Sequence, residues 1–242
     1  MQCSFEQVSQ SSAWNPGFVD VVDTHAQSIV IRIRDMEIGI ETKIVMLLGN
    51  PGKRYAMTRH NLAWWVGDAL SEEQRATFRP GWGQFYSTEI RVAEQGVLLV
   101  KPTTYMNLSG HVLTELSERL EVTADDLVAV ADDIALPRGQ IRVRPSGSSG
   151  GHNGLASLIE VLGSDQFARV RCGVGPVPPG LDPAEFVLAP FAENELSLAW
   201  EMAERAAAAV KMILTDGVVA TANTFNRKPP APEAPKGDQS GA

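Results

Sequence analysis

The sequence predicts an α/β domain in which helices cover both faces of a sheet. Apolar runs of strand length alternate with segments of helical periodicity, which is the pattern of layered α/β folds. The 242 residues, 44% of them hydrophobic, are long enough to bury one good core. Polar and glycine-rich clusters stand at the ends of the expected strands, where an open α/β sheet gathers its ligand site.

The first half of this domain is defined by apolar runs and turn signals. Residues 43–48 are a buried strand that stops at the Gly-Asn-Pro-Gly turn of 49–52. Residues 61–78 carry apolar side chains at helical spacing, which predicts a helix. Residues 84–93 and 97–100 are expected to form two strands of a hairpin.

The second half continues the alternation. The expected strands are 127–131, 140–144 and 169–175. The expected helices are 107–120, 154–162 and an Ala-rich segment from 193 to about 214. A Ser/Gly loop at 145–151 separates the second of these strands from the second helix.

The two ends of the chain differ from this domain. Residues 1–42 are expected to be an N-terminal extension, in which the alternating run 28–34 favours an edge strand. The domain itself is placed at 43–226. Residues 227–242 are rich in Pro, Ala and Gly without periodicity, so a disordered tail is expected.

Composition excludes several functional classes. With 21 Lys and Arg against 29 Asp and Glu, the net charge of −8 gives no global attraction to nucleic acid, so such contact needs a local basic patch. No apolar run approaches the roughly 20 residues of a membrane span. Cys3 and Cys172 form neither a disulfide framework nor a zinc motif. No signal peptide is recognisable, so a cytoplasmic protein is expected.

Three polar clusters carry the residues of a candidate site. They are Gly49 to Asn61 with its Asn50, Tyr55 and His60, Thr103 to Gly110 with Met106 and Asn107, and Asp132-Asp133 together with Gly150 to Gly154. A histidine takes a proton from water near neutral pH, and a carboxylate on its other ring nitrogen raises its basicity. Carboxamides hold carbonyls or water without adding charge. The set therefore favours hydrolysis by a general base.

Each cluster alone has an ordinary structural alternative. The glycine turn is most often only a tight turn, and His60 alone favours a packing or helix-start histidine. The Asp pair and Asn107 are common as loop residues or helix N-caps. The glycine-rich segment at 150–154 is also a plain loop that enters a helix, although such an entry suits phosphate binding as well.

Two pairs of arginines supply a candidate basic patch. Arg142 with Arg144, and Arg169 with Arg171, each share one face of an expected strand because side chains alternate along it. The alternative is that these arginines pair with acids such as Asp182 or Glu185.

The clusters occur in an order that resembles a known family, the bacterial-type peptidyl-tRNA hydrolases. The matching blocks are LLGNPGKRYAMTRHN (47–61), VKPTTYMNLSG (100–110), ADDIALPRG (131–139), SGGHNGL (149–155) and RVRCGVG (169–175). The resemblance covers about residues 43–215. It implies a single three-layer α/β/α domain with a central mixed, mostly parallel sheet. It also implies hydrolysis of the ester between a peptide and the 3′-terminal ribose of tRNA.

The resemblance implies a role for each motif residue in the reaction. His60 resembles the general base, and Asp132 resembles the carboxylate that orients it. Asn50 and Asn107 resemble the amides that place substrate and water, with Met106 lining the site. No metal and no cofactor are implied.

Further residues are implied in substrate binding. Asn153, with His152 beside it, resembles the amide that binds the peptide backbone and the tRNA end, and Tyr55 resembles the aromatic residue that stacks on the terminal adenosine or ribose. A last set resembles the basic clamp for the tRNA 5′-phosphate, namely Arg142, Arg144 and Arg171. Peptidyl-tRNA is the expected partner, and nothing demands more than a monomer.

A second function shares these motifs. Group II intron splicing factors of chloroplasts resemble the same family and bind RNA without catalysis. The complete set of His60, Asp132 and the three Asn residues favours the enzyme. The N-terminus lacks the features of a transit peptide, which is the better discriminator.

Overall fold

The structure of the chain is a computed structural model in which part of the sequence is described. The described residues are 20–22, 30–33, 36–38 and 42–227. The chain divides into two compact units, residues 1–40 and 41–242. The rest of the expected N-terminal extension and residues 228–242 of the expected tail lie outside the described residues.

The first unit contains a small antiparallel sheet. Its strands are β1 (Asp20–Val22), β2 (Val30–Ile33) and β3 (Met36–Ile38), paired in that order. The strand expected within 28–34 is present as β2, but the expectation of an edge strand is wrong, because β2 pairs with β1 on one side and β3 on the other.

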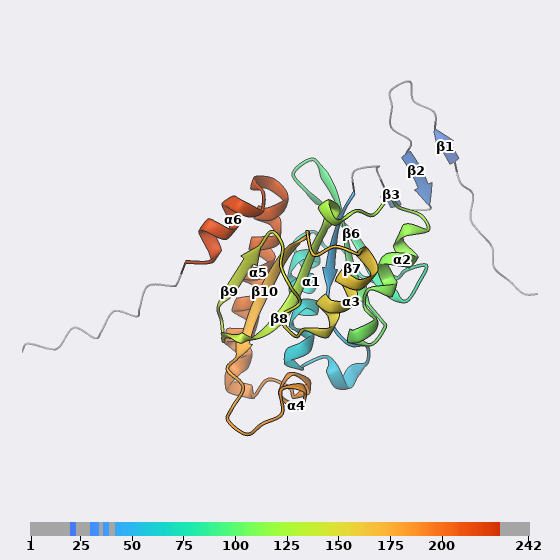
Figure 1. The fold of residues 1–242 in the computed structure, drawn as a ribbon. Coiled ribbons are helices and arrows are strands. Elements are labelled where there is room, and N and C mark those ends of the chain that lie inside the picture. Colours follow the sequence, from blue (N-terminus) through green and yellow to red (C-terminus); the bar gives the residue numbers. More distant parts are fainter. Residues whose placement is uncertain (1–19, 23–29, 34–35, 39–41, 228–242) are drawn as a thin grey trace, which may run out of the picture. The chain divides into compact units, whose positions relative to one another are not determined.

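The second unit is built on a seven-stranded mixed sheet (Figure 1). Its strands in chain order are β4 (Lys43–Leu47), β5 (Arg79–Pro80), β6 (Phe85–Val92), β7 (Gln95–Pro102), β8 (Leu127–Pro137), β9 (Ile141–Arg144) and β10 (Ala168–Gly175). Across the sheet the order is β5-β6-β7-β4-β8-β10-β9. β4 pairs in parallel with β7 and β8, and β8 with β10, whereas β5-β6-β7 and β10-β9 are antiparallel. The expected mixed, mostly parallel sheet is confirmed, because only β6 and β9 of these seven strands run against the others.

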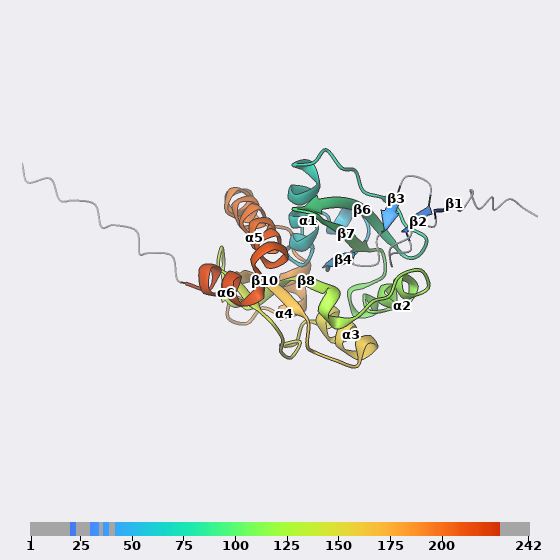
Figure 2. The same ribbon diagram turned by 90° about the horizontal axis from the view of Figure 1, so that it is seen from above.

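Helices cover both faces of this sheet, as Figure 2 shows. They are α1 (Leu62–Glu72), α2 (His111–Ser117), α3 (Asn153–Leu162), α4 (Pro183–Leu188), α5 (Leu196–Asp216) and α6 (Val218–Phe225). α1 and α5 pack together on one face, and α2 and α3 pack together on the other. The expected three-layer α/β/α arrangement is confirmed.

The core beneath α1 and α5 holds the first polar cluster, Gly49 to Asn61, in place. Apolar side chains of β4 and β8 pack on α1, those of β10 pack on α5, and all belong to one buried cluster with the alanines of α5. Trp65 of α1 stacks on Trp200 of α5 at 4.7 Å between ring centroids. The indole N–H of Trp65 also donates to the carbonyl of Ala56 at 2.8 Å. The segment before His60 is thereby fixed to the core by a hydrogen bond.

The helix expected at 61–78 is shorter than predicted. A 3₁₀ turn, η2 (Arg59–Asn61), precedes α1, and α1 ends at Glu72. Arg75 adopts a left-handed conformation with φ of 54°, and the N–H of Ala76 bonds the carbonyl of Ser71 at 2.9 Å. This is a Schellman termination, which usually requires glycine. The prediction was wrong because the sequence has no glycine at this position.

The helix expected at 107–120 is divided in two. The 3₁₀ turn η3 (Met106–Leu108) is followed by α2, which begins at His111. The hydroxyl of Ser109 donates to the carbonyl of Met106 at 2.9 Å and closes the tighter turn. Asn107 therefore lies inside η3, and the alternative that it caps the following helix is wrong.

The strand expected at 127–131 is longer than predicted. β8 continues through both aspartates to Pro137, because β10 pairs with it beyond that point. Cys172 lies opposite Asp132, and Gly173 lies opposite Asp133. A Cβ on Gly173 would stand 2.1 Å from the carbonyl oxygen of Pro137, so only glycine permits this close approach. Two consecutive carboxylates indicate the end of a strand, and here the pairing with β10 outweighs that signal.

The C-terminal part has elements that periodicity did not reveal. The helix expected at 193–214 begins as the 3₁₀ turn η5 (Glu193–Glu195) and continues as α5. α4 and α6 were not predicted, and neither was the two-residue β5 in the first half of the domain. The helix expected at 154–162 is confirmed as α3. Within the described residues, no helix combines the length and the apolar character that crossing a membrane requires.

Candidate active site

One cleft gathers most of the residues singled out in the sequence. It has a volume of about 700 Å³ and lies where the parallel strands β4, β7 and β8 lead into their loops. Nine of the eleven candidate residues line it, namely Asn50, Tyr55, His60, Met106, Asn107, Asp132, His152, Asn153 and Arg171. Arg142 and Arg144 are not among its lining residues. The three polar clusters therefore converge on one site.

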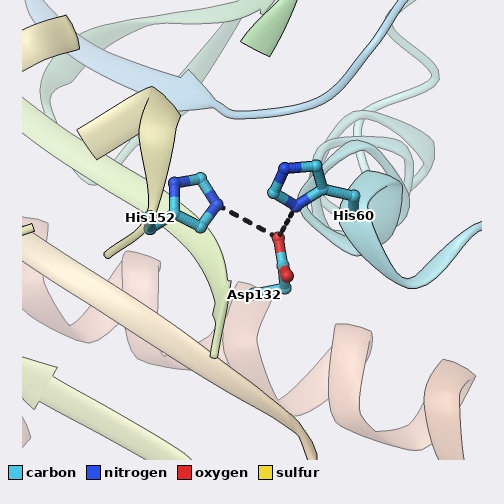
Figure 3. A group of neighbouring side chains, drawn as sticks. All are labelled: His60, Asp132 and His152. Atoms are coloured by element: carbon cyan, nitrogen blue, oxygen red, sulfur yellow. Dashed lines mark hydrogen bonds and ion pairs between the residues drawn. The ribbon is translucent and has the colours of Figure 1, made fainter. Parts of the chain in front are cut away.

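Two histidines share one carboxylate oxygen at the floor of the cleft (Figure 3). Nδ1 of His60 lies 2.7 Å from Oδ1 of Asp132, and Nε2 of His152 lies 3.1 Å from the same oxygen. The two imidazole centroids are 4.9 Å apart. All three side chains are buried. The sequence indicated the pairing of His60 with Asp132, whereas the contact of His152 with that carboxylate was missed.

The hydrogen bonds fix the proton positions on both rings. The N–H of Leu155 donates to Nδ1 of His152 at 3.2 Å, so the neutral ring carries its proton on Nε2 and donates it to Asp132. Nδ1 of His60 donates to the same carboxylate, which leaves Nε2 of His60 with a free lone pair. His60 is thus the ring with an unused basic nitrogen in the cleft.

The carboxylate of Asp132 stays ionised in this setting. Its side chain is only 2% exposed, and burial by itself would raise its pKa. The neighbouring His60 and His152 outweigh that effect, so the pKa of Asp132 is lowered below its ordinary range. Asp132 therefore presents a negative charge to His60 throughout the neutral pH range.

The same three side chains have the residue types of a metal site. In the described part of the chain, one ligand atom from each of His60, Asp132 and His152 lies within 4.8 Å of the others. A metal on Nε2 of His152 needs the lone pair there, and the bond from Leu155 to Nδ1 places a proton on Nε2 instead. The donor set as folded therefore fits a proton-bound cluster rather than a metal centre.

The turn after β4 is held by Asn61, a residue of the first polar cluster for which the sequence predicted no role of its own. Asn61 is fully buried, and its Oδ1 accepts from the N–H of Asn50 at 2.8 Å while its Nδ2 donates to the Asn50 carbonyl at 2.9 Å. Oδ1 of Asn50 accepts from the N–H of Met106 at 2.9 Å. This bond orients the carboxamide and leaves its NH₂ group as the donor available to a ligand. The only feature of the sequence that could have indicated this role is that Asn61 directly follows His60.

The upper part of the cleft is more open. Asn107 and Asn153 are exposed, and Tyr55 is half-buried in η1 (Lys53–Tyr55). The guanidinium of Arg54 lies 4.5 Å from the centroid of the Tyr55 ring. These side chains offer amide groups and an aromatic face to a ligand that enters the cleft.

An apolar wall, which the sequence did not indicate, completes the cleft. It comes from α4 and is formed by Pro183, Ala184, Val187 and Leu188. Arg59, next to His60, donates to the carbonyls of Ala189 at 3.2 Å and Pro190 at 3.1 Å. Arg59 also bonds Glu195 at 2.7 Å, so one buried side chain ties the wall to the histidine segment. α4 is only six residues long and has no motif with an evident chemical role, so the sequence did not indicate this wall.

Register between β9 and β10 places the arginines on one face of the sheet. Arg142 lies opposite Arg171, and Arg144 lies opposite Arg169. Arg144 is exposed, and Arg142 is half-buried. The Arg171 guanidinium lies 3.0 Å from Oδ2 of Asp133. Three of the four cations remain accessible on the side of the sheet that holds the cleft.

Two expectations about these arginines are corrected. Arg169 is only 1% exposed and donates to the carbonyls of Ser148 and Asp165, so it supports the loop before α3 and does not join a surface patch. Asp182 does not pair with Arg171, because it caps α4 through the N–H groups of Ala184 and Glu185. The ion pair of Arg171 is with Asp133.

Fold and site together define an α/β enzyme in which a carboxylate-bound histidine faces an amide-lined cleft. The sequence model of the family described as peptidyl-tRNA hydrolase matches residues 44–233. The peptidyl-tRNA hydrolase of Desulfitobacterium hafniense is 40% identical over 185 residues, which cover 76% of this chain and 100% of that protein. The one of Pseudothermotoga lettingae is 36% identical over 184 residues, 76% of this chain and 96% of that protein.

A solved structure agrees with this relationship. The crystal structure of peptidyl-tRNA hydrolase from Acinetobacter baumannii is similar with a TM-score of 0.71 and 29% identity, over 79% of this chain and 98% of that one. The chain belongs to the peptidyl-tRNA hydrolase family. This membership supports the enzyme, and the comparisons give no support to the splicing-factor alternative.

Proposed function

We propose that the chain hydrolyses the ester between the C-terminal carboxyl group of a peptide, or an N-blocked aminoacyl group, and the 3′-terminal ribose of tRNA. The free tRNA then returns to translation. The observation that carries this proposal is the 2.7 Å bond between His60 and Asp132 inside a cleft with three Asn side chains. The names of the relatives point to the same substrate.

The reaction follows from the proton positions. Nε2 of His60 takes a proton from water as the water oxygen attacks the ester carbonyl carbon. The bond to the ribose oxygen then breaks, and the imidazolium returns its proton to that oxygen. Asp132 stabilises the imidazolium between the two steps because its negative charge lies against Nδ1. The NH₂ group of Asn50 positions the substrate or the attacking water.

The remaining lining residues are assigned to substrate binding. Tyr55 stacks on the terminal adenosine or ribose, and Met106 lines the reacting end of the cleft. Asn107 and Asn153 bind the peptide backbone and the tRNA end through their carboxamides. His152, which the sequence assigned to substrate binding, also holds the carboxylate of Asp132.

The reaction is proposed to need neither metal nor cofactor. Purified protein should release N-acetyl-aminoacyl groups from tRNA at the same rate with and without EDTA, because the proton on Nε2 of His152 occupies the position of a metal. The measurement is single-turnover release of the labelled amino acid. Loss of turnover in EDTA that Zn²⁺ restores would contradict the metal-free mechanism. Folded protein that binds tRNA without turnover would instead contradict the hydrolase.

A basic clamp for the 5′-phosphate of the tRNA is proposed on β9 and β10. Arg142, Arg144 and Arg171 lie on the cleft side of the sheet, where guanidinium groups can bind phosphate oxygens. In a chain of net charge −8 this local patch supplies the attraction that the whole protein lacks. Binding through it should weaken steeply with added salt.

Arg171→Ala should raise KM for full-length peptidyl-tRNA about tenfold and leave kcat nearly unchanged, because a charge-assisted hydrogen bond to phosphate is lost. Steady-state kinetics at two salt concentrations measures both the effect and its salt dependence. Arg91→Ala, which removes an exposed arginine from β6, is the matched control. An unchanged KM in Arg171→Ala would remove this residue from the clamp.

The organisation of the protein is proposed along the same lines. Residues 43–226 are the catalytic domain, residues 1–42 an N-terminal extension, and residues 227–242 a C-terminal tail. We also propose that the protein acts as a monomer, since one chain supplies all the residues that line the cleft. The proposed compartment is the cytoplasm.

A further inference from the structure

Asn226, the residue directly after α6, is bonded to the backbone of the edge strand β9. The N–H of Val143 donates to Oδ1 of Asn226 at 2.7 Å, and Nδ2 of Asn226 donates to the carbonyl oxygen of Val143 at 2.9 Å. One carboxamide thus satisfies both backbone groups of a single residue. It takes the place that a neighbouring strand would occupy on this edge of the sheet.

The bonded residue is the centre of the strand that carries two clamp arginines. In an antiparallel pair, successive residues direct their N–H and C=O groups alternately toward the partner strand and away from it. Val143 directs its groups away from β10, toward Asn226. Arg142 and Arg144 stand on either side of Val143, and their side chains point to the opposite face from the buried Val143 side chain.

β9 depends on such support because it is a short edge strand. It has four residues and pairs with β10 on one side only. An edge strand whose outer N–H and C=O groups lose their partners opens more often than a strand inside a sheet. Each opening would spread the guanidinium groups of Arg142 and Arg144 over more positions.

The carboxamide is held by a packed helix rather than by the chain terminus. α6 lies beside β9 (Figure 1). Thr221 is fully buried and donates from Oγ1 to the carbonyl of Gly217 at 2.8 Å. Val218, Ala222 and Phe225 pack against the core. Because α6 is packed on the core, Asn226 is held in place and restrains the exposed edge strand through its two hydrogen bonds.

We propose that Asn226 is a positioning residue for the recognition of the tRNA 5′-phosphate: it fixes β9 so that Arg142 and Arg144 are preorganised for the phosphate. This inference rests on the proposed function, in which those arginines belong to the clamp. Asn226 itself touches no substrate. Its loss should act on KM through the 5′-phosphate and not on the chemistry at His60.

Asn226→Ala should raise KM about three- to tenfold for N-acetyl-aminoacyl-tRNA that carries a 5′-phosphate, because two backbone hydrogen bonds are lost. Its kcat should stay at the wild-type value. With the same tRNA after removal of the 5′-phosphate, KM should equal that of wild-type protein. The matched control is Asn223→Ala, which removes an exposed asparagine from the same helix and should change neither constant.

Arg144→Ala, measured beside these variants, separates this inference from the proposed clamp. If KM of the wild-type protein is the same for tRNA with a 5′-phosphate and with a 5′-hydroxyl, the proposed clamp and the role of Asn226 are both contradicted. If the two KM values differ, and Arg144→Ala abolishes the difference while Asn226→Ala preserves it, only the role of Asn226 is overturned. An equal loss on both substrates would mean a general structural role and would also overturn it. If Asn226→Ala does not fold, Asn226→Gln replaces it in this test. Gln keeps the carboxamide but displaces it from Val143, so KM for the 5′-phosphorylated substrate should again rise.

Discussion

His60→Ala reduces kcat for release of the peptide from peptidyl-tRNA by about 100- to 10,000-fold, the range that a positioned general base contributes. KM changes little, because His60 acts on water and the binding groups of the cleft remain. The reason lies in the tautomer: Asp132 holds the proton on Nδ1, so Nε2 is the basic nitrogen that faces the cleft. Single-turnover release of labelled peptide measures the chemical step directly.

The control and a chemical test sharpen this prediction. His111→Ala removes an exposed histidine at the start of α2 and should leave kcat unchanged. Added imidazole should restore part of the activity of His60→Ala, since it can occupy the space of the lost ring and accept the proton from water. Turnover of His60→Ala within a few-fold of wild type would show that another group takes the proton.

Asp132→Asn lowers kcat by about 100-fold or more, because a neutral carboxamide cannot stabilise the imidazolium that forms on His60. The variant also removes the anionic oxygen that both imidazoles share. Asp133→Asn is the matched comparison. The carboxylate of Asp133 contacts Arg171 and the N–H of Ala135, so this second variant should affect KM more than kcat.

Stability provides a second readout for Asp132. Its pKa in the folded protein is lowered from the ordinary value of 3.8, so ionised Asp132 stabilises the fold at pH values above about 4. This contribution is lost as pH falls through the lower pKa of the folded state. The difference in free energy of unfolding between wild type and Asp132→Asn should therefore be complete near neutral pH and shrink below pH 4. Equal kcat values for the Asp132→Asn and Asp133→Asn variants would contradict the assigned role.

Local pattern was sufficient for much of the fold. The run at 43–48 is entirely apolar after Lys43, and a strand buried on both faces needs no alternation. The helix at 154–162 was found because its periodicity is regular and a glycine, Gly163, ends it. Where a boundary depended on pairing or on an unusual residue, as at Asp132 and Arg75, local pattern failed.

The reactive groups of this protein could be predicted without a structure. They are a histidine, a carboxylate and three amides in motifs that stand at strand ends, and their order along the chain indicated the family. How these groups act together depends on contacts between elements that lie far apart in the chain. His152 reaches Asp132 because α3 begins beside β8. The wall of α4 meets the cleft because Arg59 binds the carbonyls of Ala189 and Pro190, directly after that helix. Asn226 reaches Val143 from 83 residues away. Such contacts depend on how helices pack on the sheet, which no local periodicity encodes.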